Sequence, residues 1–191
     1  MSTSISGDDL ILEIDKVRFS IVNCSLCKLH KTRMNAVPGE GNFNAKIMLV
    51  GEAPGKKEDE LGKPFVGMAG KILDQVLDKA GIDRSKIFIT NVVKCRPPGN
   101  RIPDEEETTA CITNHLQRQI SIIRPRVICV LGRTALESLL GMKSILANRG
   151  KTVFRNDIKY FLTIHPAATI YNVKLRSYLE KDMTTLAQEY L

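Results

Sequence analysis

The sequence predicts an α/β protein: a single three-layer α/β/α sandwich around a four-stranded parallel sheet, formed by one domain over residues 1–191. The first observation is that helical patterns of apolar residues alternate with short apolar runs, as in parallel sheets covered by helices. The second is that glycines follow several of these segments, where helices and strands end. The third is the length, 191 residues, which suits one compact domain.

Each expected element rests on a local pattern. Four apolar runs predict the strands, and the last of them is expected to form a hairpin with residues 152–155 through the turn Asn156-Asp157. Apolar residues at helical spacing predict the helices. The expected strands are residues 46–50, 86–93, 127–131 and 160–164; the expected helices are residues 10–23, 69–80, 134–140 and 173–190, with another opening at residues 103–107.

Composition narrows the class of protein. Hydrophobic residues make up 43% of the chain and charged residues 26%, which excludes a disordered, collagenous or coiled-coil protein. No apolar run approaches the roughly 18 residues of a membrane helix, and the start, MSTSISGDDLILEIDKVRFS, has no basic leader typical of secretion. We therefore expect a cytoplasmic protein. The net charge of +7 favours polyanionic partners such as DNA or RNA, although it is equally typical of an ordinary basic enzyme.

Four of the five cysteines form a pattern. Cys24 and Cys27 are separated by two residues, and Cys95 and Cys111 by fifteen. In an intracellular protein such cysteines favour a metal centre over disulfides, and both zinc and iron–sulfur sites use the C-x2-C spacing. Cys129 lies inside the apolar run 127–131 and is expected to be a small buried hydrophobic residue.

Parallel sheets bind ligands beyond the carboxyl ends of their strands, so the residues that follow each expected strand are candidates for a site. The first strand leads into GEAPGKKEDELGKPFVGMAG, a shaped loop whose spacing does not match a phosphate-binding P-loop. In it, Glu52 is either a pocket carboxylate or a solvated acid, and Phe65 is either a core residue or a platform for a planar ring.

Two further residues follow strands. Asn91 lies in a setting that disfavours asparagine, and its amide offers both a donor and an acceptor suited to the edge of a base. His165 is the one histidine of three that directly follows an expected sheet strand, where an imidazole can act as an acid or hydrogen-bond donor. Each also has a purely structural interpretation.

Taken together, CSLCKLHKTRMNAVPGEGN, GEAPGKKEDELGKPFVGMAG, ITNVVKCRPPGNR, the later Cys111 and HPAA resemble the family 4 uracil-DNA glycosylases, the iron–sulfur branch. The resemblance extends from residue 24 to residue 176, with the motifs in the family's order. It implies the same α/β/α fold around a four-stranded parallel sheet. The implied reaction is hydrolysis of the N-glycosidic bond of uracil in DNA, after the base has been flipped out of the duplex.

The resemblance also implies roles for site residues. Phe65 would stack on the flipped ring, and Asn91 would recognise uracil at O4 and N3 and so reject cytosine. His165, with backbone N–H groups near Glu52 and Ala53, would stabilise the negative charge that develops on uracil O2.

In the base-binding loop, formed by Gly51, Ala53 and Gly55, two positions depart from related glycosylases. Gly55 lies where some relatives carry a bulky ring that excludes the methyl group of thymine. Ala53 replaces an aspartate that orients water in the best-known glycosylase family, so Glu52 is our candidate for part of that work. After the last strand, Ala167 lies where many relatives have a phosphate-binding serine.

By the same resemblance, Cys24, Cys27, Cys95 and Cys111 would bind a [4Fe–4S] cluster, with zinc as the alternative. Hydrolysis moves no electrons, so the expected role of the cluster is structural. It would hold a basic set where phosphates can meet it: Lys28, Lys31, Arg33, Lys94, Arg96 and Arg101. The segment from Ala167 to Asn172 would enter the duplex or keep its strands apart.

Other functions stay open at this point: a glycosylase for hypoxanthine, xanthine or mismatched bases, a non-catalytic metal-stabilised module that binds nucleic acid, and a redox enzyme. Relatives can associate with replication sliding clamps, but the sequence shows no clear clamp-binding peptide. We expect a monomer whose substrate is uracil-containing DNA.

Overall fold

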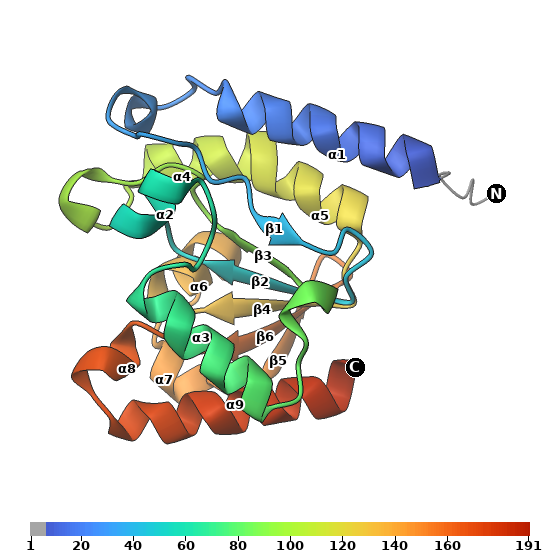
Figure 1. Cartoon of the computed structure of the whole chain (residues 1–191). Helices are drawn as coiled ribbons and strands as arrows, with labels where there is room; N and C mark the ends of the chain where they lie inside the picture. The colour runs from blue at the N-terminus through green and yellow to red at the C-terminus, as the bar shows by residue number, and fades with distance from the viewer. Residues whose placement is uncertain (1–6) are drawn as a thin grey trace.

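The computed structural model describes residues 7–191 (Figure 1). Its sheet has the strand order β1-β3-β2-β4-β6-β5. The four inner strands are parallel to one another: β3 (Phe88–Asn91), β2 (Ile47–Gly51), β4 (Val127–Leu131) and β6 (Ile158–Thr163). The first six residues, part of the segment for which the sequence predicts no secretory signal, lie outside the described residues.

The sheet is larger than predicted. The expected four parallel strands form its centre, and an antiparallel strand adds to each edge: β1 (Glu40–Gly41) beside β3, and β5 (Thr152–Arg155) beside β6. The hairpin of β5 and β6 was predicted, and its turn residues Asn156 and Asp157 have φ of 49° and 61°, as a two-residue hairpin turn requires. The two-residue strand β1 was not predicted, because so short a segment has no apolar pattern.

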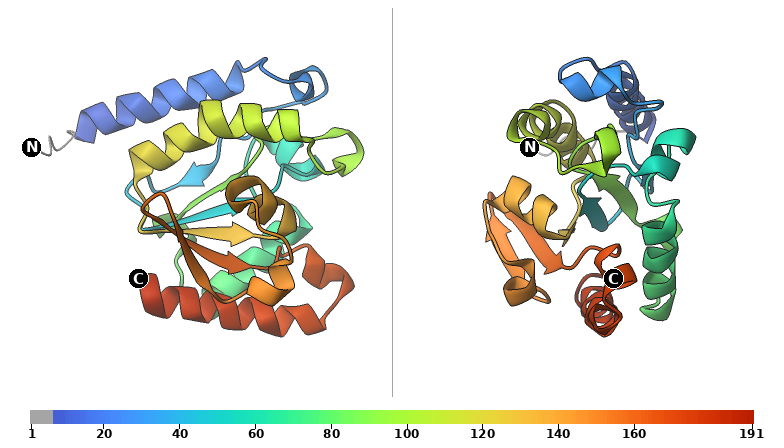
Figure 2. Two further views of the ribbon diagram at one scale, coloured as in Figure 1. Left: turned by 180° about the vertical axis from the view of Figure 1, so that it is seen from behind. Right: turned by 90° about the vertical axis from the view of Figure 1, so that its left-hand side faces the viewer.

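Helices cover both faces of the sheet (Figure 2). On one side lie α1 (Gly7–Val22), α4 (Glu105–Cys111), α5 (Gln117–Ile123) and α6 (Arg133–Leu140); on the other lie α3 (Met68–Lys79) and α9 (Lys174–Tyr190). Shorter helices complete the chain: α2 (Lys56–Leu61), α7 (Ile145–Asn148) and α8 (Ala168–Tyr171), with η1 (Lys28–Lys31), η2 (Arg84–Lys86), η3 (Pro98–Asn100) and the π-turn η4 (Ile112–Leu116). Helix α2 corrects the expectation that residues 51–70 are loop throughout.

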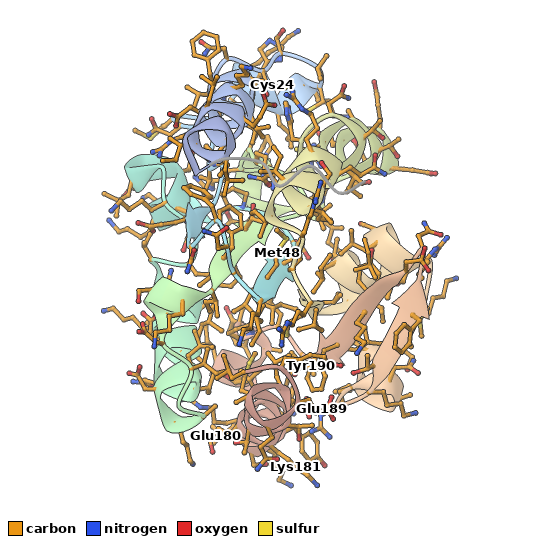
Figure 3. All side chains as sticks on the ribbon, turned by 90° about the vertical axis from the view of Figure 1, so that its right-hand side faces the viewer. Cys24, Met48, Glu180, Lys181, Glu189 and Tyr190 are labelled. Atoms are coloured by element: carbon orange, nitrogen blue, oxygen red, sulfur yellow. The ribbon has the colours of Figure 1, made fainter. Side chains whose placement is uncertain are left out.

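Each face of the sheet has its own core. In β2, Met48 and Val50 pack with α1, α5 and α6, whereas Ile47 and Leu49 pack with α3. Because the inner strands are buried on both faces, their sequences are continuous apolar runs. Figure 3 shows Met48 inside the molecule and Lys181 on the outer side of α9. No helix within residues 7–191 is both long and apolar enough to cross a membrane.

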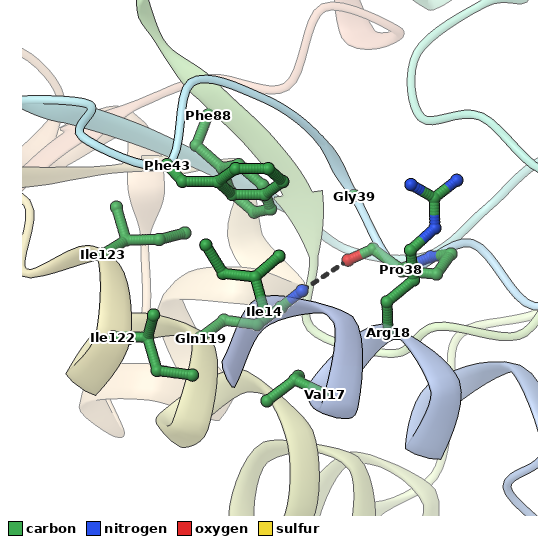
Figure 4. A pocket seen from close by; sticks show the side chains of 10 residues that line it. All are labelled: Ile14, Val17, Arg18, Pro38, Gly39, Phe43, Phe88, Gln119, Ile122 and Ile123. Carbon is green, nitrogen blue, oxygen red and sulfur yellow. Dashed lines mark hydrogen bonds between the residues drawn. The ribbon is translucent and has the colours of Figure 1, made fainter. Parts of the chain in front are cut away.

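An apolar cavity marks where α1 packs on the rest of the fold (Figure 4). Ile14 and Val17 of α1 face Phe43 and Phe88 across it. At its edge the side-chain amide of Gln119 donates a hydrogen bond of 2.6 Å to the carbonyl of Pro38. This contact ties α5 to the segment that leads into β1.

Candidate active site

A pocket lies beyond the carboxyl ends of the parallel strands. This is the end of the sheet near which α2 and α8 lie (Figure 1). The volume of the pocket is about 210 Å³. An apolar cavity of about 150 Å³ is known to hold benzene, so this pocket has the size for a single-ring base. The lining residues come from five stretches of the chain: Ala53, Gly55, Glu58, Phe65, Ala69, Asn91, Asn100, His165 and Ala167.

Phe65 forms an aromatic wall of the pocket. Its ring centroid lies 5.6 Å from that of His165, with 31° between the planes. Its backbone has φ of 52°, a left-handed conformation that is costly for a residue with a side chain and is concentrated at ligand sites. The loop is held from both sides: Glu58 accepts the N–H groups of the next two residues at 2.9 and 2.8 Å, and Arg84 donates to the Pro64 carbonyl at 2.9 Å.

Asn91 ends β3 and is 2% exposed. Its side-chain oxygen Oδ1 is buried and has no hydrogen-bond partner among the described residues. Gly51, the register partner of Asn91 on β2, leaves the room that this amide needs. A Cβ added at Gly51 would lie 2.5 Å from Asn91 Oδ1 and 2.7 Å from Phe65 Cζ. The pocket therefore requires glycine at position 51, and it is lined by Asn91, whose amide oxygen has no partner among the described residues.

His165 follows β6 and has a defined tautomer. Its Nδ1 accepts a hydrogen bond of 3.1 Å from the backbone N–H of Ala167. Burial lowers the pKa of His165 to about 4, against a smaller opposite effect of the Glu58 carboxylate. The imidazole is therefore neutral near pH 7, and because Nδ1 is the acceptor, the proton lies on Nε2. His165 is thus a neutral N–H donor in a pocket that also holds an aromatic ring.

Two acids of the segment 51–70, Glu52 and Glu58, lie differently. Glu58, in the first turn of α2, is 9% exposed and lines the pocket. Its Oε2 lies 2.8 Å from the position of a Cβ at Gly55, so the carboxylate fills the space beside that glycine. Glu52 is half-buried, its carbonyl accepts the Val93 N–H, and its side chain is not among those that line the pocket.

The predicted base-binding residues are thus largely brought together. Ala53, Gly55, Phe65, Asn91 and His165 line the pocket, and Gly51 backs it. Sequence reasoning missed Glu58 and Asn100. The signal for Glu58 was its place four residues after Pro54 in the shaped loop, but the surrounding run KKEDE has the composition of a solvated helix face.

Exposed apolar residues follow Ala167 along the chain. They lie on and after α8, in the segment predicted to contact the duplex. Tyr171 is 91% exposed, Val173 79% and Ile170 41%. Ala167, at the start of this segment, lines the pocket itself. The exposed apolar residues therefore belong to the same short segment as one residue that lines the candidate base pocket.

The four predicted cysteine ligands lie together. Cys24, Cys27, Cys95 and Cys111 all line one cavity between α1, η1 and α4, and all five cysteines of the chain are unpaired thiols. Cys129 is fully buried in β4, as predicted. Within residues 7–191 no three Cys, His, Asp or Glu side chains are set so that they could share one metal ion.

Cations surround this cysteine cavity. Arg33 donates a hydrogen bond of 3.0 Å to Cys95 Sγ and another, of 2.8 Å, to the Val22 carbonyl. The backbone N–H of Lys94 donates to Cys111 Sγ at 3.3 Å. Burial raises the pKa of the Cys111 thiol to about 12, and the nearby Lys94 ammonium opposes that rise. Such donors and charges suit a buried group that carries thiolates.

One predicted phosphate contact is wrong. Lys94 is 1% exposed, and its Nζ donates to Thr90 Oγ1 at 2.6 Å and to the Asn91 carbonyl at 2.8 Å. It cannot meet DNA, because its ammonium is inside the fold. Arg33 donates a hydrogen bond to Cys95. Lys28 forms an ion pair of 2.6 Å with Asp104, and Arg101 forms one of 2.6 Å with Glu107.

Comparison with known proteins places the chain in a family. The profile of the uracil DNA glycosylase superfamily matches residues 38–187. The chain belongs to the uracil-DNA glycosylase superfamily. It is 49% identical to a type-4 uracil-DNA glycosylase of Saccharolobus solfataricus, over 92% of this chain and 83% of the relative. It is 46% identical to the type-4 enzyme of Sulfurisphaera tokodaii (92% and 84% covered) and 41% identical to that of Archaeoglobus fulgidus (92% and 92%).

Proposed function

We propose that this protein is a uracil-DNA glycosylase, which hydrolyses the N-glycosidic bond of uracil in DNA and leaves an abasic site. The observation that carries the proposal is the buried, unpartnered Oδ1 of Asn91 in a pocket of single-ring size. Uracil has an N–H at N3 that would donate to this oxygen. Cytosine has a bare nitrogen there, so its binding would leave the buried acceptor unpaired.

The same pocket supplies what bond cleavage requires. The base must leave the duplex to be reached, and the ring of Phe65 offers a stacking surface for it. As the bond breaks, negative charge develops on uracil O2, and we assign Nε2–H of His165 as the donor that stabilises it. A neutral imidazole suits this task, because its single N–H lies on Nε2 and stays on the ring near pH 7.

Thymine differs from uracil by one methyl group, and we assign its exclusion to Glu58. In some relatives a bulky ring at the position of Gly55 excludes that methyl group. Here the Glu58 carboxylate lies 2.8 Å from where a side chain at Gly55 would begin. It is held there by its two backbone hydrogen bonds to the Phe65 loop. A methyl group placed in this space would contact and desolvate a carboxylate, which is unfavourable.

Activation of the attacking water stays assigned to Glu52. Glu52 follows Gly51 at the carboxyl end of β2 and directly precedes Ala53, which lines the pocket. Glu58 already uses Oε1 to hold the Phe65 loop, so the two carboxylates have separable tasks. On this assignment Glu52 polarises water and Glu58 shapes the pocket.

The contact with DNA is assigned to the exposed tip of α8. Glycosylases and other proteins that distort DNA insert apolar side chains between base steps. Tyr171 and Val173 are highly exposed, follow the pocket residue Ala167 along the chain, and have the character of such a wedge. They would occupy the gap that the flipped nucleotide leaves in the stack.

We further propose that Cys24, Cys27, Cys95 and Cys111 hold a [4Fe–4S] cluster. The donor set fits: four thiols line one cavity, with a guanidinium on one sulfur and a backbone N–H on another. When bound, the cluster would join η1 and the end of α1 to α4. No step of hydrolysis uses it. Iron and acid-labile sulfide in about fourfold amount would support it, and zinc at one equivalent would contradict it.

The test of the proposed reaction is alkaline strand cleavage of oligonucleotides that each carry one modified base. We expect abasic product from uracil, in single or double strands, and none from thymine or cytosine. Product from hypoxanthine or xanthine alone would assign another base specificity. Binding without any abasic product would identify a nucleic-acid-binding module.

Assembly and partners stay predictions. A monomer is expected, and light scattering of the purified protein tests it. An association with a replication sliding clamp would be detected by co-elution with a purified clamp on gel filtration.

A further inference from the structure

His115 is a buried side chain without a task in the proposed reaction. It is 4% exposed, and neither ring nitrogen has a hydrogen-bond partner within the described part of the chain. Buried polar groups in native proteins are nearly always paired, so such an orphan requires an explanation. His115 lines the cavity that also holds the four cysteines.

The backbone brings His115 to this cavity through an unusual turn. Helix α4 ends at Cys111, and residues 112–116 form the π-turn η4 before α5 begins. The N–H of Gln117 reaches back five residues to the Ile112 carbonyl. Such π-turns are rare and often lie at functional sites, because they change the direction of the side chains that follow. Here the turn begins directly after a predicted ligand, Cys111, and contains His115.

The charges near His115 fix which form of the ring faces the cavity. Burial lowers the pKa of His115 to about 4, and the cations Lys94, Arg118 and Arg33 act in the same direction. A neutral imidazole carries one N–H and is not repelled by the cations around the thiols. The cavity already contains one donor of this kind, because Arg33 donates to Cys95 Sγ.

We propose that His115 donates a hydrogen bond to a sulfur of the group bound by the four cysteines, either an inorganic sulfide or a cysteinyl sulfur. The inference rests on the proposed [4Fe–4S] cluster. It explains why a buried imidazole without protein partners lies in this cavity. Hydrogen bonds to cluster sulfurs stabilise the reduced, more negative state, so His115 would tune the cluster as well as position it.

The experiment compares His115→Leu with His115→Asn in the iron-loaded protein. Leucine fills the site without a polar group, and asparagine keeps a side-chain N–H. Iron and sulfide content, the cluster reduction potential by EPR-monitored titration, the Fe–S stretching frequencies by resonance Raman, and the melting temperature are measured. We expect His115→Leu to shift the potential negative and change the Raman bands, and His115→Asn to restore part of both.

The outcomes separate this inference from the proposed cluster. If His115→Leu keeps its iron, has the wild-type potential and Raman bands and melts at a higher temperature, His115 is an unpaired residue and the inference is overturned. Loss of iron from His115→Leu but not from His115→Asn supports it, and loss from both variants overturns it. Wild-type protein without iron would instead refute the proposed cluster.

Discussion

Replacing Asn91 by alanine should lower the rate of uracil cleavage while leaving the stability of the folded protein unchanged or higher. In the protein alone, Asn91 Oδ1 is buried without a partner among the described residues, a situation that costs about 1–3 kcal/mol. Removing it offsets the lost packing of a small side chain, so we expect the melting temperature of Asn91→Ala to stay within about 4 °C of wild type or to rise. With uracil bound, the amide would form two hydrogen bonds, to N3–H and O4.

The loss of those two bonds sets the expected magnitude. At about 1.5 kcal/mol each they contribute about 3 kcal/mol, which corresponds to roughly a hundredfold in kcat/KM. The assay is single-turnover cleavage of a uracil oligonucleotide, with melting measured on the same samples. Asn114→Ala, the same exchange at an exposed asparagine bonded to its own helix, is the control. Near wild-type cleavage by Asn91→Ala, or a large fall in its melting temperature, would refute the reasoning.

Four further predictions follow from the pocket and the segment after it. Glu52→Gln should lower turnover at least tenfold with uracil-DNA binding retained. Glu58→Ala should release thymine from DNA, because the pocket then has room for the methyl group. Thymine release by Glu52→Gln alone would reverse the two assigned roles. Tyr171→Ala should slow cleavage of double-stranded substrate more than of single-stranded substrate. An equal effect on both substrates would refute the proposed role of Tyr171 as a wedge in the duplex. Because the pKa of His165 is lowered to about 4, the ring is neutral from pH 8 to pH 6, and the cleavage rate should stay level over that range. The rate should fall only as the pH approaches 4. A step in the rate near pH 6.5 that is absent from His165→Gln would contradict this.

The protonation of His165 has a consequence for stability as well. Its pKa is lower in the folded protein than in the unfolded chain, so the unfolded state binds the proton more readily at mildly acidic pH. Its contribution is therefore fully present above about pH 6.5 and is lost as the pH falls toward 4.

The parts of the fold that the sequence predicted are those decided by local pattern. The predicted strand 127–131 has the same first and last residues as β4. A strand that is buried on both faces is apolar throughout, so its ends are easy to recognise in the sequence. Asn156 and Asp157 marked the hairpin, since both tolerate the positive φ that its turn requires. Strand β1 depends on hydrogen bonds to β3 alone, so its own sequence could not reveal it.

The site was predicted where resemblance supplied it and missed where tertiary packing decides. Phe65, Asn91 and His165 lie on three different segments; their places after expected strands made them candidates, and the resemblance assigned them to one base pocket. Glu58 was missed because burial of a helix-start carboxylate depends on the Phe65 loop folding over it. Lys94 was placed on the surface because lysine usually lies there, although the apolar residues around it in NVVKC pointed inward.

The most direct measurement is a crystal structure of the protein with a uracil-containing single strand whose glycosidic bond resists hydrolysis. We predict that the base lies in the 210 Å³ pocket against Phe65, with N3 within hydrogen-bond distance of Asn91 Oδ1 and O2 facing Nε2 of His165. A base seated elsewhere, or one whose O2 and N3 face neither side chain, would contradict the proposed recognition and with it the mechanism.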